Sequence, residues 1–218
     1  MCEKNKADFT AYMECGDFEI LSASPERFIK ISENVIETFP VKGTRPRGKN
    51  KEEDEMLKKE LLESEKEKAE LSMITDLLRN DMGKVCAIGS VKVIDPRIAR
   101  AYTFVWHTYS HIKGILADGV SKMDALTSMF PGGSITGCPK KRAMEIIAEL
   151  EWKQRGIYTG AIGYKEGEEL NFNIAIRTII KKGNKAYLSV GGGIVYDSTE
   201  DGEYEETLHK AKSFFGLL

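Results

Sequence analysis

Two pairs of glutamates carry a spacing that suits a metal site. Glu67 and Glu70 lie in EKAELSM, and Glu203 and Glu206 lie in EYEET. On a helix, a separation of three residues puts both carboxylates of a pair on one face. Two such pairs could hold a hard divalent cation, since Mg²⁺ commonly takes one or two protein carboxylates and keeps several waters. A solvated helix face has the same pattern, so both interpretations stay open.

A cationic segment, FPVKGTRPRGK at 39–49, contains two prolines and two glycines. Because proline fixes φ and glycine permits tight turns, we predict a shaped loop here. Its Lys42 could be a solvated cation, part of an anion site, or a nucleophile. An amine attacks only when it is deprotonated, which desolvation or a neighbouring cation promotes, and Arg45 is close in sequence.

Arg177 stands in FNIAIRTII, which predicts a strand in which Arg177 shares a face with Asn173 and Ala175. An arginine among small residues suits bidentate capture of a carboxylate, and an exposed strand arginine is the alternative. His107 and His111 in HTYSH would be about 13 Å apart along a strand, too far to share a metal ion. We expect one of them to act alone as a hydrogen-bond donor in a site.

Two glycine-rich segments could bring the backbone close to a ligand. GGSITGCPK precedes a predicted helix and could cradle an oxyanion or a carboxylate. It has neither the P-loop spacing nor the dinucleotide fingerprint. GGGIV at 191–195 offers a second place for close approach.

The elements that must position these residues follow from periodicity. Short β-prone runs at 18–23, 27–32 and 35–39 precede a Glu-, Lys- and Leu-rich region at 52–81, which predicts one or two amphipathic helices. Strands are expected at 90–95 and 99–116, and helices at 121–129 and from Pro139 onward. YTGAIGY, ELNFNIAIRTII and KAYLSVGGGIVYD are predicted β segments that lead to a helix at 198–216. Strands grouped around central helices predict an α+β fold with largely antiparallel β-sheets packed against helices.

Composition sets the class of protein. The chain has 218 residues, 41% apolar and 30% charged, with a net charge of −2. These values predict a globular domain with a sizeable core and no general attraction to nucleic acid or to a membrane. No apolar run is long enough for a membrane span, and no secretory segment is evident. Scattered cysteines indicate reduced thiols and a cytoplasmic location: Cys2, Cys15, Cys86 and Cys138.

Seven motifs in one order resemble the chorismate-utilising enzymes. They are SASPERF, PVKGTRPRG, EKAELSMITDLLRND, FPGGSITGCPKKRAMEII, YTGAIGY, NIAIRT and GGGIVYDSTEDGEYEETLHKA. That family includes anthranilate synthase component I, aminodeoxychorismate synthase component I, isochorismate synthase and salicylate synthase. The resemblance runs from about Tyr12 to the C-terminus and implies the anthranilate/aminodeoxychorismate synthase-like fold. It implies a chorismate-binding catalytic domain over residues 1–218, N-terminally truncated against the family pattern, so that a complementing N-terminal chain is an expected partner.

The resemblance also implies chorismate as substrate and one Mg²⁺ as cofactor. Glu26 matches a general acid that assists departure of the ring hydroxyl, and His107 matches a histidine beside the substrate ring. The implied metal positions are Glu70 and Glu206, with Glu67 and Glu203 behind them. The implied substrate-binding positions are Thr44, Ser134, Tyr158, Arg177, Gly193 and Lys210.

Lys42 separates the branches of the family. At this position the aminodeoxychorismate enzymes have a motif that resembles P-I-K-G-T, whereas anthranilate synthases usually have P-I-A-G-T. This chain has PVKGT and so resembles the first group. In the lysine branch the amine attacks C2 of chorismate and expels the C4 hydroxyl, and ammonia then attacks C4 and expels the lysine. Leu71, where anthranilate synthases often have histidine, is compatible with that branch.

The resemblance thus implies an aminodeoxychorismate synthase component I that forms 4-amino-4-deoxychorismate for p-aminobenzoate and folate biosynthesis. Its ammonia would come from a glutamine amidotransferase subunit. An anthranilate synthase component I of tryptophan biosynthesis is the alternative, because GTRPRG is shared. An inactive fragment that acts as an assembly module is a further alternative from another class.

Overall fold

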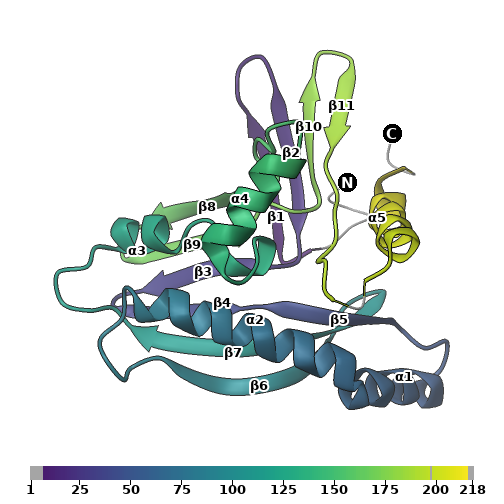
Figure 1. Cartoon of the computed structure of the whole chain (residues 1–218), viewed down its shortest axis with the longest axis horizontal. Coiled ribbons are helices and arrows are strands. Elements are labelled where there is room, and N and C mark those ends of the chain that lie inside the picture. The colour runs from purple at the N-terminus through teal and green to yellow at the C-terminus, as the bar shows by residue number, and fades with distance from the viewer. Residues whose placement is uncertain (1–6, 197, 216–218) are drawn as a thin grey trace. The chain divides into compact units, whose positions relative to one another are not determined.

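A computed structural model describes residues 7–196 and 198–215 (Figure 1). The chain forms two compact units. Unit one consists of Met1–Pro25, Lys153–Ile162 and Ile174–Leu218, and unit two of Glu26–Trp152 and Gly163–Asn173. No helix in the described residues is long and apolar enough to cross a membrane.

Unit two is built on a seven-stranded sheet in the order β5-β7-β4-β3-β9-β8, with β6 also paired to β7. Every pairing among β3, β4, β5, β6, β7 and β9 is antiparallel. The strands are β3 (Arg27–Ser32), β4 (Val35–Phe39), β5 (Val41–Pro46), β6 (Lys92–Ala101), β7 (Val105–Ile115), β8 (Ala161–Glu166) and β9 (Glu169–Ile174). The α+β class with antiparallel sheets is therefore confirmed.

The long strand β7 organises this sheet. β4 pairs with its second half and β5 with its first half, so β4 and β5 follow each other along one side of β7. Pro40 lies between them, and its carbonyl accepts a hydrogen bond from the Ser110 N–H at 3.2 Å. The segment 39–49 was predicted to be a loop, which is wrong for Val41–Pro46. These residues form a strand because β7 offers a backbone edge that sequence periodicity does not reveal.

Two helices contact β5, β6 and β7 of this sheet, namely α1 (Lys51–Glu63) and α2 (Glu65–Gly83). The region predicted as one or two helices is thus two. Ser64 separates them with an extended backbone, and the Arg97 guanidinium donates to its carbonyl and to that of Leu61. This arginine provides a donor for the Leu61 carbonyl in the last turn of α1, while the Ser64 carbonyl also accepts from the Lys68 N–H of α2. Beneath the helices lie the almost fully buried side chains of Leu61, Leu71, Met82 and Ile112.

Three shorter elements complete unit two. They are α3 (Lys122–Met129), the 3₁₀ turn η1 (Gly133–Ile135) and α4 (Lys140–Leu150). α3 begins after Ser121, whose side chain forms a capping box with Asp124. α3 and η1 both contact α2.

Unit one contains a four-stranded sheet, in the order β1-β2-β10-β11, with all its pairs antiparallel. The strands are β1 (Phe9–Glu14), β2 (Glu19–Ser24), β10 (Thr178–Lys182) and β11 (Lys185–Leu188), and the helix α5 (Glu200–Phe215) ends the described chain. Ile20, Ile162 and Ala175 form a small buried cluster. The cysteines with described positions, Cys15, Cys86 and Cys138, are free thiols, and Cys2 lies outside the described residues.

Several predicted strands have different bounds in the structure. β1 was not anticipated, and the predicted strand at 99–116 is the end of β6 plus all of β7. The segment ELNFNIAIRTII was predicted to be one strand, but β9 ends at Ile174 and β10 begins at Thr178. In the described part of KAYLSVGGGIVYD the strand is confined to Lys185–Leu188, and the glycines lie in irregular backbone. Local apolar runs predict strand content well and strand breaks poorly.

We expect Ile112→Ala to lower the free energy of unfolding by about 2–5 kcal/mol, because its side chain is fully buried in β7. Ile115→Ala, in the same strand but 44% exposed, is the matched control and should cost less than about 1 kcal/mol. Urea denaturation followed by circular dichroism would measure both. Equal losses for the two variants would contradict the placement of the core.

Candidate functional site

Glu26 is a buried carboxyl group at the start of unit two, only 8% exposed. Burial raises the pKa of Glu26 to about 7, against smaller lowering effects from a hydrogen bond with Ser134 and from the charge of Lys42. A carboxyl group with this pKa is partly protonated at neutral pH. It can therefore donate or accept a proton where an ordinary glutamate cannot.

Lys42, Gly43 and Thr44 form a bulge in β5. Lys42 pairs with Thr108 and Thr44 with His107, so the register shifts at Gly43. The Thr108 hydroxyl donates to the Lys42 carbonyl, which fixes the backbone on one side of the bulge. Bulges of this kind bend a strand and redirect its side chains, and they are frequent beside active sites.

Gly43 cannot be replaced without strain. Its φ of +81° is in the left-handed region, and a Cβ there would lie 3.0 Å from Leu61 Cδ1 and 3.2 Å from Glu67 Cδ. The bulge is therefore packed directly against the side of α2 that carries Glu67. The motif KGT and the first glutamate pair, 23 or more positions apart in the sequence, meet at this contact.

The two histidines of HTYSH have different partners. The Nδ1 atom of His107 lies 2.9 Å from the Thr44 hydroxyl and 3.3 Å from the Gly43 carbonyl. His111 Nε2 lies 2.9 Å from Glu37, and its ring stacks on Phe39 at 4.4 Å between centroids. Of the two, His107 is thus the one that belongs to the Lys42–Thr44 cluster.

Glu67 and Glu203 share an uncommon feature, each within its own unit. One oxygen of each carboxylate is held by a donor: Arg45 donates to Glu67 at 2.8 Å, and Ser198 donates to Glu203 at 2.6 Å. The second oxygen of each is buried and has no hydrogen-bond partner within the described part of the chain. Buried carboxylate oxygens are normally satisfied, so each of these keeps unused capacity to accept a hydrogen bond or to contact a cation.

The second members of the glutamate pairs differ in their surroundings. Glu70 is half-buried on α2, one turn after Glu67. Glu206 on α5 forms an ion pair of 2.5 Å with Lys210. Among the described residues no three acidic, histidine or cysteine side chains gather into a group that could hold a metal ion. The unsatisfied oxygens of Glu67 and Glu203 fit a hard cation such as Mg²⁺.

The glycine segment 191–193 in unit one packs against functional candidates. The Lys210 ammonium donates to the Gly191 carbonyl at 3.1 Å. A Cβ on Gly191 would lie 2.8 Å from the Tyr158 hydroxyl oxygen, and one on Gly192 would lie 2.6 Å from Glu203 Oε2. The segment therefore brings Gly193, Tyr158 and Lys210 into the neighbourhood of Glu203.

Arg177 lies in a bend, not in a strand as predicted. Its φ is +50°, and its carbonyl accepts a hydrogen bond from the Ala23 N–H at 3.0 Å. The face shared with Asn173 and Ala175 is therefore not formed, because the chain breaks between β9 and β10. The guanidinium is half-buried, burial lowers its pKa, and within the described residues it has no acidic partner. An arginine in this setting, on a strained backbone, suits an anionic ligand.

Sequence reasoning missed two residues that hold the glutamate pairs in place, Ser198 and, in this role, Arg45. Ser198 also accepts a hydrogen bond from the Val195 N–H at 3.0 Å, which ties the glycine segment to the start of α5. Neither role can be predicted from the neighbouring residues. The turn before α5 determines the partner of Ser198, and a contact with another element, α2, determines the partner of Arg45.

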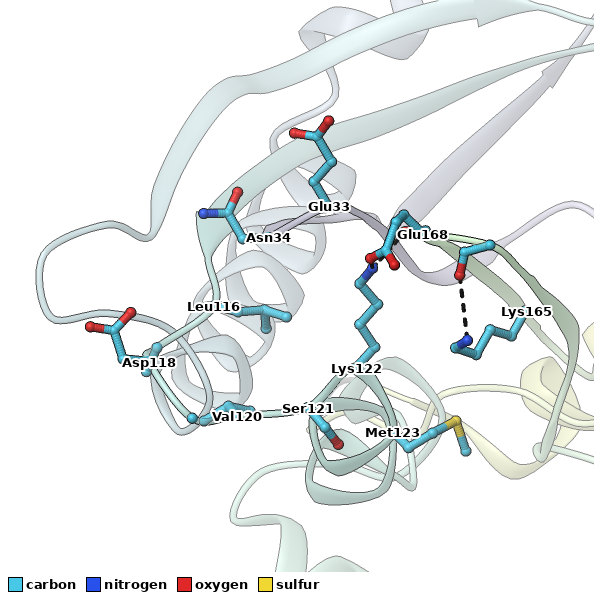
Figure 2. A pocket seen from close by; sticks show the side chains of 13 residues that line it. Glu33, Asn34, Leu116, Asp118, Val120, Ser121, Lys122, Met123, Lys165 and Glu168 are labelled. Atoms are coloured by element: carbon cyan, nitrogen blue, oxygen red, sulfur yellow. Dashed lines mark hydrogen bonds and ion pairs between the residues drawn. The ribbon is translucent and has the colours of Figure 1, made fainter.

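A pocket of about 440 Å³ lies near the end of β7, away from the half that pairs with β5 (Figure 2). The turn at Glu33 and Asn34, the segment 116–123 and the turn at 165–168 line it. Lys122 is already paired with Glu168, as the dashed line in Figure 2 shows. None of the predicted site residues lines this pocket, and its lining offers no comparable set of chemical groups.

A family model described as chorismate binding enzyme matches residues 1–216. The chain belongs to the chorismate binding enzyme family. It is 46% identical over 210 residues to aminodeoxychorismate synthase component 1 of Bacillus subtilis, a match that covers 96% of this chain and 45% of the relative. It is also 46% identical over 215 residues to an anthranilate synthase component 1 of Haloarcula marismortui, covering 98% and 44%.

A solved structure of a relative has a similar fold. Anthranilate synthase component I from Streptococcus pneumoniae has a TM-score of 0.88 and 40% identity, and the match covers 97% of this chain and 47% of that one. The anthranilate synthase-like fold is thus confirmed. This chain spans less than half the length of each of these relatives.

We expect one glutamate carboxyl signal to titrate near pH 7 in ¹³C NMR and to be absent in Glu26→Gln. Ser134→Ala should raise this pKa further, since the Ser134 hydrogen bond lowers it. The folded state binds more protons than the unfolded state between about pH 4.5 and 7, so unfolding free energy should fall as pH rises through that window. Glu26→Gln should remove this part of the slope. A Glu26 signal that titrates below pH 5 would contradict the burial of the carboxyl group.

Proposed function

We propose that this chain is the chorismate-binding part of an aminodeoxychorismate synthase component I. The observation that supports this most is that the charge of Lys42 acts on the buried carboxyl group of Glu26. A primary amine and a carboxyl group with a pKa of about 7 are close enough for the charge of one to affect the other. A nucleophile and a general acid in one site are what displacement of a hydroxyl group requires.

In the proposed reaction the Lys42 amine attacks C2 of chorismate, the ring double bond shifts, and the C4 hydroxyl departs. Protonated Glu26 donates its proton to that hydroxyl, which leaves as water. Ammonia then attacks C4 and the C2–nitrogen bond breaks, which frees Lys42 and gives 4-amino-4-deoxychorismate. The raised pKa of Glu26 serves the first step, because an ordinary glutamate would be ionised at neutral pH.

We assign a Mg²⁺ cofactor to Glu70 and Glu206, with Glu67 and Glu203 behind them. When bound, this ion would neutralise a substrate carboxylate and stabilise negative charge as the hydroxyl leaves. Arg45 and Ser198 orient Glu67 and Glu203 by holding one oxygen of each. The second oxygens of Glu67 and Glu203, which have no hydrogen-bond partner among the described residues, support this assignment.

The remaining candidates are assigned to substrate binding. Arg177 and Tyr158 would hold a carboxylate of chorismate, for which the guanidinium without an acidic partner in the described residues is well suited. His107, fixed by Thr44, would face the ring. Groups at the other end of the substrate would come from Ser134, Gly193 and Lys210.

Partners and location follow from this proposal. The similar proteins are named as component 1, in keeping with a second subunit that supplies ammonia, which we assign to a glutamine amidotransferase. We expect neither nucleic acid nor membrane as a partner, and a cytoplasmic location. The chain spans less than half of its relatives, so a complementing N-terminal portion belongs to the proposal.

Anthranilate synthase component I is the second candidate, because relatives with that name are equally similar in sequence. The presence of lysine at position 42 favours the first. An assembly module without turnover is the outcome if the chain binds a complementing portion but does not act on chorismate with it.

We expect Lys42→Ala and Lys42→Arg to reduce product formation from chorismate, Mg²⁺ and ammonium by on the order of 100-fold or more. The arginine variant keeps the charge but cannot act as the nucleophile. Lys49→Ala, an exposed cation of the same segment, is the control and should have little effect. Product would be measured as p-aminobenzoate after addition of the downstream lyase. Direct release of fluorescent anthranilate, or full activity in Lys42→Ala, would reject the assignment.

Calorimetric titration with MgCl₂ in the presence of chorismate tests the metal assignment. We expect Glu67→Gln and Glu203→Gln to weaken Mg²⁺ binding by about 10-fold or more, because each loses an anionic oxygen. Glu65→Gln, with a well-exposed carboxylate on the same helix as Glu67, should bind Mg²⁺ like the unaltered chain. Unchanged binding in both site variants would exclude a contribution of Glu67 and Glu203 to Mg²⁺ binding.

A further inference from the structure

The segment 130–139 joins α3 to α4 and carries Ser134, the hydrogen-bond partner of Glu26. Within it only the short 3₁₀ turn η1 is regular, and the Thr136 hydroxyl holds that turn by donating to the Gly132 and Gly133 carbonyls. These bonds lie within the segment and do not set its position against Glu26. Something outside the segment must therefore fix Ser134 against Glu26. The contacts of Lys140 identify what does so.

The Lys140 ammonium lies at the point where the segment closes on itself. It donates to the Pro131 carbonyl at 2.8 Å and to the Met129 carbonyl at 3.3 Å, and it pairs with Asp81 at 2.6 Å. These three contacts use all three of its N–H donors. Lys140 thus ties the start of the segment to its end and both to α2.

The Asp81 end of this arrangement is rigid. Asp81 is 2% exposed on α2, and its other oxygen accepts from Lys84 at 2.9 Å. A buried carboxylate held by two cations is costly to disturb, because loss of one partner leaves charge uncompensated. The anchor of the segment is therefore an ion pair within the packed part of unit two.

Close packing of the segment against α2 connects this ion pair with the position of Ser134. Its neighbour Gly133 is buried, and a Cβ there would lie 2.8 Å from Leu77 Cγ and 3.1 Å from Asp81 Oδ2. The backbone next to Ser134 thus rests directly on α2 beside the ion pair. A shift of a few tenths of an ångström at Lys140 or Asp81 would move Ser134 as well.

We propose that Lys140 and Asp81 are positioning residues that set the hydrogen bond between Ser134 and Glu26 by clamping the segment 130–139 onto α2. They act through the backbone of the segment and take no part in the reaction. This role rests on the proposed function only where Glu26 is treated as the acid. The clamp itself is a property of unit two and is measurable without turnover.

The test is the pKa of Glu26 in Lys140→Met, followed by ¹³C NMR. Loss of the clamp should weaken the Ser134 hydrogen bond, which lowers this pKa, so the value should rise toward that of Ser134→Ala. The Lys42 charge, the other group acting on Glu26, is untouched by the substitution. Lys140→Met added to Ser134→Ala should cause no further change. Lys141→Met, an exposed neighbour, is the control and should leave the pKa unchanged.

Gly133→Ala is the second variant, in case Lys140→Met does not fold. Its added methyl group should push the segment off α2 and raise the pKa of Glu26 in the same direction, without altering any charge. Lys140→Arg keeps a cation at this position and should therefore raise the pKa of Glu26 less than Lys140→Met does. If Lys140→Met and Gly133→Ala lower the melting temperature but leave the Glu26 pKa at its original value, the residues are merely structural and the proposal is overturned.

Activity separates this inference from the proposed function. If the unaltered protein is active, Lys140→Met should lower kcat by about 10-fold with little change in KM. The substitution impairs the orientation of Glu26 and not the binding of substrate. A shifted Glu26 pKa in a chain that shows no turnover even with its complementing portion would support the clamp and reject the enzyme assignment. An unshifted pKa in an active chain would do the reverse.

Discussion

The pairing of β5 with β7 is the constraint on which unit two depends. Because β4 and β5 share one side of β7, the chain must pass Pro40 and then accommodate one extra residue at Gly43. That residue has a left-handed backbone and no space for a side chain. Lys42, Thr44, His107 and Glu67 come together as a result, although they belong to three different elements. A non-glycine residue at 43 would strain the fold and the site together.

Burial gives the charged groups of the site their chemical character. Glu26 is removed from water, and the Ser134 hydroxyl and the Lys42 charge offset only part of that effect, so its proton is retained up to about pH 7. Glu67 and Glu203 each have one oxygen held by a donor and one left without a partner in the described residues. These arrangements do not stabilise the fold, since unsatisfied buried groups are costly. They are the local costs that binding sites characteristically carry.

Similarity to known proteins establishes the family but does not separate its branches. An aminodeoxychorismate synthase component and an anthranilate synthase component are each 46% identical to this chain over almost its full length. Both matches span nearly all of this chain at the same identity, so overall similarity does not distinguish the two. In the function proposed above, the distinction depends on one position, where the Lys42 amine beside Gly43 either attacks the substrate or does not.

The sequence alone determined the α+β class, most of the helices, the order of the motifs and the resemblance to chorismate-utilising enzymes. This was possible because helical periodicity and motif order can be recognised in the sequence without knowledge of contacts between distant residues. It could not determine that 41–46 is a strand, that the backbone breaks at Arg177, or that Lys140 and Asp81 clamp the Ser134 segment. Each of these depends on a partner far away in the chain: a free edge of β7, the Ala23 N–H, and a buried carboxylate on α2. The pKa of Glu26 is likewise a tertiary property, because the sequence specifies a carboxyl group and only folding removes the water around it.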